Sequence, residues 1–252
     1  TPMGHGGTLD PFATALIVVA VVEGVKLTRY LLGSEKSYSA EIAFGARTAS
    51  GDLTNEVVAR TEVLPTDRSM LTRAISDFLG KPYLQTPPMY SAKQVDGIPL
   101  YELARKGLEV ERAAIKCKIS DFEVENITET LSSRPGISSA RIRATVSSGT
   151  FIRTLAEDLA VRMGSLGHLT SLRRLASGSI SLTNAFSIER LIRALDDGRP
   201  WSALPCFTPF HRALLGILPG MEIDVPVAER IFSGEVKTLA ELSLRQPGSI
   251  AL

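Results

Sequence analysis

The chain is poor in the residues that identify several large classes of protein. Its 252 residues include two cysteines and three histidines, and neither set has the short spacing of a zinc site or a paired-cysteine redox motif. Cys117 and Cys206 are far apart in the sequence, so we expect two free thiols in a reducing compartment. Disulfide-stabilised secreted domains are excluded, and no metal site is expected.

Long apolar runs and an excess of one charge are also lacking. The longest apolar run, Phe12 to Val22, ends at Glu23 and is too short to span a bilayer. No signal peptide is visible, so we expect a cytoplasmic protein that makes no membrane contact. The net charge of +1 neither indicates nor excludes a nucleic-acid partner, because a basic face can coexist with a neutral total.

A glycine-rich stretch near the start of the chain, Gly4-His5-Gly6-Gly7-Thr8-Leu9-Asp10-Pro11, combines backbone freedom with an imidazole and a carboxylate. Glycines let a backbone approach a ligand closely, and the proline keeps Asp10 extended. The residues from Pro11 to about Val22 are predicted to form a helix, with proline at its first position. Asp10 alone is then open to two interpretations: a cap for that helix or a reactive carboxylate.

Period-two and helical patterns alternate along the rest of the chain. Strands are predicted at 37–44, 114–124 and 140–146, with 56–63 returning as a partner of the first, and 168–175 is strand-like. Helices are predicted at 68–79, 100–106, 152–163 and 188–195, and an amphipathic stretch at 227–233. Strands and helices interleave without strict βαβ alternation, which predicts an α+β fold.

The residues allow one kind of covalent chemistry. An aspartate can be a nucleophile when a cation keeps it ionised. Arg153 follows a Ser-Ser-Gly-Thr turn and begins a helix, where a positive charge is unfavourable to the helix dipole. A carboxylate partner would explain that position, whereas the alternative is an ordinary surface arginine. A phosphate bound by the glycine loop is disfavoured, because Asp10 would repel it.

Five motifs in order resemble the TruB family of tRNA pseudouridine synthases. They are Gly4-His5-x-Gly-Thr-Leu-Asp10-Pro11, Glu35-Lys36-x-Tyr38, Pro87-Pro88-Met89-Tyr90-Ser91-Ala92-Lys93, Gly149-Thr150-Phe151-Ile152-Arg153 and Gly167-His168-Leu169-x-x-Leu172-Arg173-Arg174. The resemblance covers the chain from Thr1 to about Leu195. It implies the pseudouridine synthase fold, a central, mixed and mostly antiparallel sheet flanked by helices.

The resemblance also implies a reaction and its catalytic residues. Uridine 55 in the TΨC loop of tRNA would be isomerised to pseudouridine, without cofactor or metal. Asp10 becomes the nucleophile, attacking either C6 of the base or C1′ of the ribose, and Arg153 becomes its ion-pair partner. Tyr38 would stack on the target base and is a candidate proton acceptor at C5; its alternative is a core aromatic.

The same match assigns residues to substrate binding. His5 would fill the space that the flipped base leaves, Leu172 would form an apolar wall, and Arg173 and Arg174 would contact phosphates. The remaining substrate-binding residues taken from the matched motifs are Lys36, Tyr90 and Lys93. Residues 85–112 resemble the family's thumb, a lid that clamps the tRNA stem-loop.

The domain organisation and the alternatives follow from the same comparison. Residues 1–204 are expected to be a catalytic domain that lacks the family's opening strand, and 205–252 a partial or reduced PUA-like RNA-binding region. A monomer is expected. One alternative is a guide-RNA-dependent rRNA pseudouridine synthase, which the thumb-like insert disfavours. Another is a tRNA-binding or folding protein without catalysis, which the presence of Asp10, Tyr38 and Arg153 disfavours.

Overall fold

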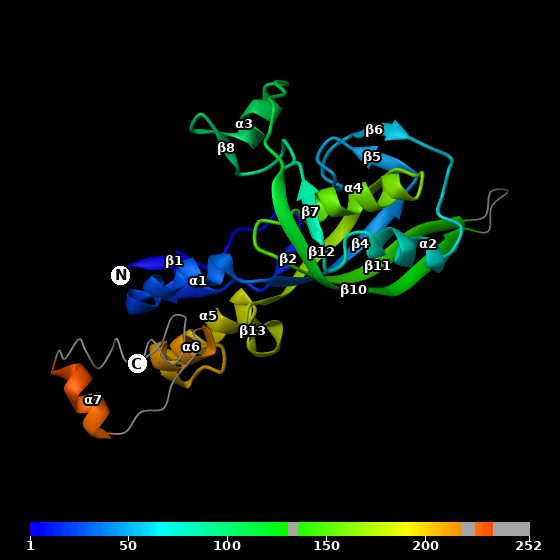
Figure 1. The fold of residues 1–252 in the computed structure, drawn as a ribbon. Helices are drawn as coiled ribbons and strands as arrows, with labels where there is room; N and C mark the ends of the chain where they lie inside the picture. The colour runs from blue at the N-terminus through cyan, green and yellow to red at the C-terminus, as the bar shows by residue number, and fades with distance from the viewer. Residues whose placement is uncertain (131–135, 218–224, 234–252) are drawn as a thin grey trace.

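A computed structural model describes residues 1–130, 136–217 and 225–233 and places a seven-stranded sheet at the centre of the molecule (Figure 1). Six strands follow the order β13-β12-β4-β11-β10-β7, and β2 pairs with β12. The strands are β2 (Thr14–Ala15), β4 (Lys36–Phe44), β7 (Pro82–Gln85), β10 (Ile115–Thr130), β11 (Gly136–Val146), β12 (Gly167–Ser177) and β13 (Ile180–Ser181). Only the β2–β12 pairing in this sheet is parallel, so the predicted α+β fold with a mixed, mostly antiparallel sheet is confirmed.

The two faces of the sheet differ because side chains alternate along each strand. One face carries the apolar core and packs against helices α4 (Ile152–Arg162) and α2 (Arg68–Ser76). Gly167 at the start of β12 permits this close approach, since a Cβ there would lie 2.8 Å from Ala160 Cβ on α4. The opposite face is polar and includes the ion pair Arg143–Glu125. The helix-covered face therefore holds the core, and the N-terminal end of α4 reaches the site described below.

The predicted helix from Pro11 to Val22 is wrong. The chain there makes a turn at 11–12, then β2 and β3 (Val19–Val21), which pairs with β1 (Met3–His5). A 3-10 helix, η1 (Val22–Leu27), and α1 (Thr28–Gly33) follow. The segment is rich in β-branched residues, which favour extended backbone, namely Thr14, Ile17, Val18, Val19, Val21 and Val22. Pairing with β1 and β12 supplies the backbone partners that a helix would otherwise have provided.

The predicted return strand has a different partner. Strand β6 (Val57–Arg60) pairs with β5 (Ala46–Thr48) in a small separate sheet, while β11 and β12 flank β4. The loop that joins β5 to β6 turns toward the start of α4, where the Ser50 carbonyl oxygen contacts Arg153. This small sheet therefore delivers a loop to the site.

The insert predicted at 85–112 projects away from the sheet (Figure 1). It contains a short hairpin, β8 (Gln94–Val95) and β9 (Ile98–Pro99), followed by helix α3 (Leu100–Arg105). Gly107 has a φ of +70° and ends that helix. Pairing of Gln85 with Ile115 joins β7 to β10 and closes the base of the insert.

The C-terminal part of the described chain is helical. It comprises α5 (Ile188–Asp196), α6 (Phe210–Ile217) and α7 (Val225–Phe232), with the short 3-10 helices η2 (Leu182–Asn184) and η3 (Trp201–Ala203). The Ser187 hydroxyl caps α5 as predicted, and the amphipathic stretch 227–233 overlaps α7. Much of the predicted PUA-like region, residues 218–224 and 234–252, lies outside the described residues. In the described ranges, no helix combines the length and apolarity needed to cross a bilayer.

Candidate active site

Asp10 and Arg153, which are 143 positions apart, form a two-point ion pair. Arg153 Nε donates to Asp10 Oδ2 at 2.8 Å, and Nη2 donates to Oδ1 at 2.6 Å. The arginine side chain is 3% exposed, whereas the aspartate side chain is 30% exposed. Asp10 begins a turn in which its carbonyl oxygen accepts from Ala13 N. The structure thus places a half-buried carboxylate in the two-point grip of a buried guanidinium.

The rest of the Arg153 guanidinium is also occupied. Nη1 donates to the Ser50 carbonyl oxygen and Nη2 to the Tyr90 carbonyl oxygen, each at 2.8 Å. Asp52 Oδ2 lies 3.7 Å from Nη1. Three segments, the glycine loop, the β5–β6 loop and the insert's leading loop, therefore meet on one side chain. A planar fork of five donors suits this task, and an ammonium does not.

Asp52 is a buried acid that the sequence analysis missed. It accepts hydrogen bonds from Ser50 Oγ at 2.7 Å and from Thr54 N at 2.9 Å. Burial alone would raise its pKa, but the bonds from Thr54 and Ser50 and the charge of Arg153 outweigh burial and hold the pKa below its ordinary value. Its signal in the sequence is a lone acid within Ser50-Gly51-Asp52-Leu53-Thr54. Asp52 supplies a second negative charge behind Arg153.

Tyr38 lies on β4, half-buried, between Arg174 and Asp10. The two strands place Tyr38 directly opposite Arg174. Burial raises the pKa of the Tyr38 hydroxyl; the charge and hydrogen bond of Arg174 oppose this, and the Asp10 carboxylate adds to it. The net direction is upward, so Tyr38 is a neutral phenol near pH 7.

Arg174 supports the backbone of the glycine loop. Its side chain is buried, and its guanidinium donates to the carbonyl oxygens of Leu16 at 2.9 Å, Gly7 at 3.2 Å and Thr8 at 3.3 Å. Gly7 has a φ of +127°, a conformation that glycine adopts without strain. Arg174 therefore faces inward, whereas the neighbouring Arg173 is exposed on the other face of the sheet beside Thr14.

Two other predicted substrate-binding residues are buried. Leu172 lies opposite Ala40 in the apolar core. Lys36 Nζ donates to three carbonyl oxygens at the end of α1, those of Leu31, Leu32 and Ser34. Burial, and secondarily the charge of Arg174, lower the pKa of Lys36 to about 8. Both side chains therefore lie in the protein interior, away from solvent.

The remaining predicted residues lie at its rim. His5 is exposed, and its Nδ1 accepts from Gly7 N at 3.3 Å. Tyr90 contributes its carbonyl oxygen to Arg153, and Lys93 is exposed where the insert begins. The structure thus brings Asp10, Tyr38, Arg153, Arg174 and the Tyr90 backbone together, with His5 on the same loop and Lys93 and Arg173 outside that group.

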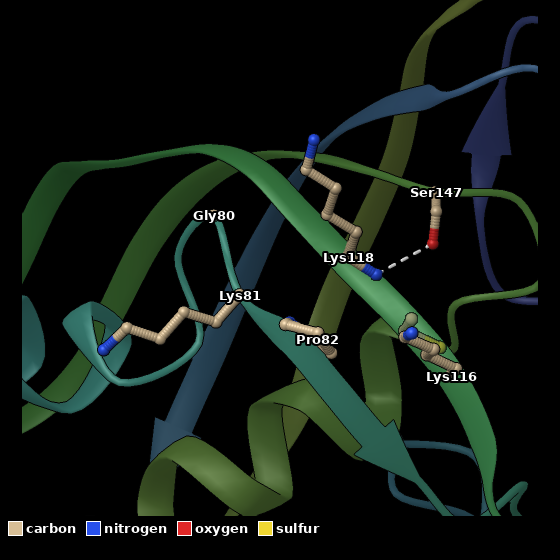
Figure 2. Close-up of a pocket in the computed structure, with 7 residues that line it drawn as sticks. Gly80, Lys81, Pro82, Lys116, Lys118 and Ser147 are labelled. Atoms are coloured by element: carbon tan, nitrogen blue, oxygen red, sulfur yellow. Dashed lines mark hydrogen bonds between the residues drawn. The ribbon is translucent and has the colours of Figure 1, made fainter.

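The structure has two hollows, of which the first borders this group at Arg153. The first, of about 330 Å³, is lined by Arg47, Arg112, Arg153, Glu157 and the loop at 86–89. Burial raises the pKa of Glu157 to about 7, while Arg47 lowers it and Asp158 raises it further. The second, of about 320 Å³, lies between β7 and β10, and Figure 2 shows its three lysines, Lys81, Lys116 and Lys118, pointing in different directions. Among the described residues, no group of three or more His, Cys, Asp or Glu side chains is placed to hold a metal ion.

Comparison with known proteins identifies the family. Residues 1–152 match the model of the TruB family pseudouridylate synthase, N-terminal domain. The tRNA pseudouridine synthase B of Cupriavidus taiwanensis is 38% identical over 232 residues, which cover 92% of this chain and 70% of that protein. The protein of the same name from Geobacter sulfurreducens is 39% identical over 231 residues, which cover 92% of this chain and 72% of that one.

Solved structures are similar in fold. A Cbf5-Nop10-Gar1 complex contains a chain that matches with a TM-score of 0.66 at 21% identity, covering 93% of this chain and 59% of that one. An H/ACA ribonucleoprotein bound to a substrate RNA matches with a TM-score of 0.60 at 20% identity, covering 87% of this chain and 54% of that one. The chain spans less than two thirds of these neighbours, and the likeness shows the fold alone. With the family model matching more than half of its length, this chain belongs to the TruB family of pseudouridylate synthases.

Proposed function

We propose that this enzyme converts uridine to pseudouridine in tRNA, at position 55 of the TΨC loop, with Asp10 as the nucleophile. The observation that carries the proposal is the Asp10–Arg153 pair, in which a buried fork holds a half-buried carboxylate by both oxygens. The relatives that match most of the chain are named tRNA pseudouridine synthase B. The isomerisation is redox-neutral, and the proposal assigns its steps to protein side chains without a metal or a cofactor.

The reaction breaks the N1–C1′ glycosidic bond and forms a C5–C1′ bond. C5 loses its proton and N1 gains one, and the covalent bond that Asp10 forms on the way is broken again before the product leaves. Asp10 attacks C6 of the base or C1′ of the ribose, and both routes use the same ionised oxygen. Arg153 keeps that carboxylate ionised and fixes its direction. Tyr38 stacks on the base, and Arg174 is the cation that would stabilise its phenolate when it accepts the C5 proton.

Base flipping is the second part of the proposal, because the target must leave its stack to reach Asp10. His5 is exposed on the glycine loop and is placed to occupy the vacated space. Lys93 and Arg173 are exposed cations for the RNA backbone. We assign to Lys36, Leu172 and Arg174 the support of the site from within, because all three are buried.

The guide-RNA-dependent alternative fits less well. Its named structural neighbours are 18–21% identical, against 36–39% for the curated tRNA enzymes. The hairpin and α3 give this chain a projecting insert of its own with which to clamp a stem-loop. We expect a monomer that acts in the cytoplasm on tRNA alone.

The test is incubation with an unmodified tRNA transcript, without guide RNA and with EDTA present, followed by mapping of pseudouridine. We expect a single modified site at position 55. A transcript with cytidine at that position is the matched control. Modification elsewhere, or only with an added guide RNA, would contradict the proposal.

A further inference from the structure

Gln85, the last residue of β7, makes a two-point contact with the residue that precedes α4. Its Oε1 accepts from Phe151 N at 2.7 Å, and its Nε2 donates to the Phe151 carbonyl oxygen at 3.0 Å. The Gln85 side chain is fully buried, at 0% exposure. A backbone N–H can only donate, so the pairing also determines which way the carboxamide points.

The remaining capacity of the carboxamide is used by its neighbours. Nε2 also donates to the Tyr83 hydroxyl at 3.2 Å, and Cys117 Sγ lies 3.9 Å from Oε1. The Tyr83 hydroxyl donates in turn to Asp158 on α4. Gln85 is therefore fully satisfied, and no N-capping side chain is found at Phe151 itself. Gln85 instead holds the backbone N–H and carbonyl oxygen of the N-cap residue itself.

This contact lies between Arg153, which holds Asp10, and Tyr90, whose carbonyl oxygen holds Arg153. Arg153 follows Phe151 by two residues, so the position of the start of α4 determines where the Arg153 side chain leaves the backbone. Tyr90 follows Gln85 by five residues, and its carbonyl oxygen accepts from Arg153 Nη2 at 2.8 Å. Gln85 thus fastens the strand that leads to the carbonyl oxygen directly to the helix that carries the donor.

We propose that Gln85 is a positioning residue for Arg153, which sets the angle at which the guanidinium grips Asp10. The inference rests on the proposed function, because it assigns to Gln85 a part in presenting the nucleophile. A reactive group must be held within about 0.5 Å of its productive place, and a misplacement of about 1 Å costs on the order of a hundredfold in rate. Asp10 is only half-buried, so its place depends largely on its bonds to Arg153.

The first test compares Gln85→Met with Ser165→Ala. Methionine keeps the length of the side chain and removes both bonds to Phe151. Ser165 is buried and donates to the Val63 carbonyl oxygen at 2.6 Å just beyond the other end of α4, so its alanine variant also loses a buried bond to backbone. We expect the single-turnover rate of Q85M to fall about ten- to a hundredfold at saturating tRNA, with a dissociation constant within threefold of wild type. S165A should stay within twofold in rate.

A second variant guards against simple misfolding. In Gln85→Glu the protonated carboxyl has one donor and one acceptor and reproduces the pairing with Phe151, whereas the ionised form has acceptors only and repels the Phe151 carbonyl oxygen. The ratio of the Q85E rate to the wild-type rate should therefore fall about tenfold between pH 5.5 and 8.5. Tyr83, Asp158 and Cys117 face the same position and are present in wild type and Q85M, so the Q85M ratio should be flat with pH.

A readout without substrate separates this inference from the proposed function. The Nε–H resonance of Arg153 reports its bond to Asp10 and should move in Q85M and not in S165A. An inactive wild type would refute the proposed function, and the resonance would still decide the role of Gln85. That role is refuted by an unmoved resonance, by a Q85M rate equal to wild type, by an equal loss in S165A, or by a Q85E ratio that does not change with pH.

Discussion

Two buried arginines hold the same loop in different ways. Arg153 grips the side chain of Asp10 from the start of α4, and it has a second acid, Asp52, within 3.7 Å. Arg174 grips the loop's backbone from β12 through two carbonyl oxygens, those of Gly7 and Thr8, and holds that of Leu16 as well. In the described ranges no carboxylate lies within ion-pair distance of Arg174.

The difference separates two tasks. At Arg153 two carboxylates, Asp10 and Asp52, outweigh the one positive charge, and what matters is the direction in which the guanidinium holds Asp10. At Arg174 the charge is balanced by dipoles and reaches Lys36 and Tyr38. Burial lowers the pKa of Lys36 and the Arg174 charge adds to that effect. Burial raises the pKa of Tyr38 and the Arg174 charge opposes that effect, so the net direction there is upward. One arginine is therefore expected to control geometry, and the other the support and the electrostatic potential of the site. The five predictions below test that division.

The largest effect is expected at Asp10. Asp10→Asn keeps the shape of the side chain, loses the nucleophile and leaves Arg153 without its partner. We expect turnover to be abolished, with tRNA affinity within an order of magnitude of wild type. Single-turnover assays and filter binding with one transcript measure both. Retained activity in this variant would refute the catalytic assignment.

Replacing each of the two arginines by lysine compares them directly, and the larger loss is expected at Arg153. Arg153→Lys should lower kcat by more than about a hundredfold, because an ammonium cannot make the two-point grip on Asp10 and reach the Tyr90 carbonyl oxygen as well. Arg162→Lys is the control on the same helix, since Arg162 is exposed and pairs with Asp77. That variant should be active. An active R153K would show that the fork is unnecessary.

Arg174→Lys should be milder, about tenfold in rate, because single carbonyl oxygens accept from an ammonium without a planar geometry. Its charge beside Tyr38 is kept. We expect the melting temperature to fall by several degrees, since a buried network loses bonds. If R174K lost as much activity as R153K at equal stability, the two arginines would share one task.

A smaller loss is expected at His5, which belongs to the loop but not to either arginine's contacts. His5→Ala should slow the reaction much less than D10N, because stacking offsets only part of the flipping cost of a few kcal/mol. Phenylalanine should restore part of the loss. An unstructured RNA should narrow the gap between wild type and H5A. A variant as inactive as D10N on both substrates would make His5 a catalytic group.

The smallest effect concerns the pH dependence of the free energy of unfolding, through Glu157, which lines the same hollow as Arg153. The pKa of Glu157 is raised by burial to about 7, so the folded state binds a proton more tightly than the unfolded state does. Stability from this group is present below pH 4.5 and is lost as pH rises toward 7. Glu157→Gln should therefore gain about 1–3 kcal/mol at pH 8 relative to its effect at pH 4.5. Denaturant unfolding of both proteins at the two pH values measures it, and a gain independent of pH would contradict the assignment.

Regular patterns made much of the fold predictable. Apolar residues recur with period two at 37–44 and with helical spacing from Ile152, and the two predicted elements are present as β4 and α4. The segment 11–22 misled because its apolar residues fit a helix by number, while their β-branched side chains and their partners β1 and β12 favour strands. Which strand pairs with which depends on contacts far along the chain, and no local pattern encodes that for β6.

The site divides in the same way. The side chains of Asp10 and Arg153 were matched by motif, and the structure joins them. Gln85 acts through the backbone of Phe151, 66 positions away, and Asp52 lies 3.7 Å from Arg153, which follows it by 101 positions; contacts over such distances leave no local spacing to detect. Burial of Arg174 likewise depends on where β12 lies in the sheet, beside β4 and β2.

The position of β12 between β2 and β4 also bears on how the protein reaches its working form. The bonds from Arg174 to the glycine loop span 166 and 167 positions of the chain. Loop closure over such lengths carries an entropic cost that must be met before the contacts form. During synthesis, the loop that carries Asp10 emerges long before either arginine that holds it. We therefore expect Asp10 to take up its place late in folding, when the strand that carries Arg174 enters the sheet.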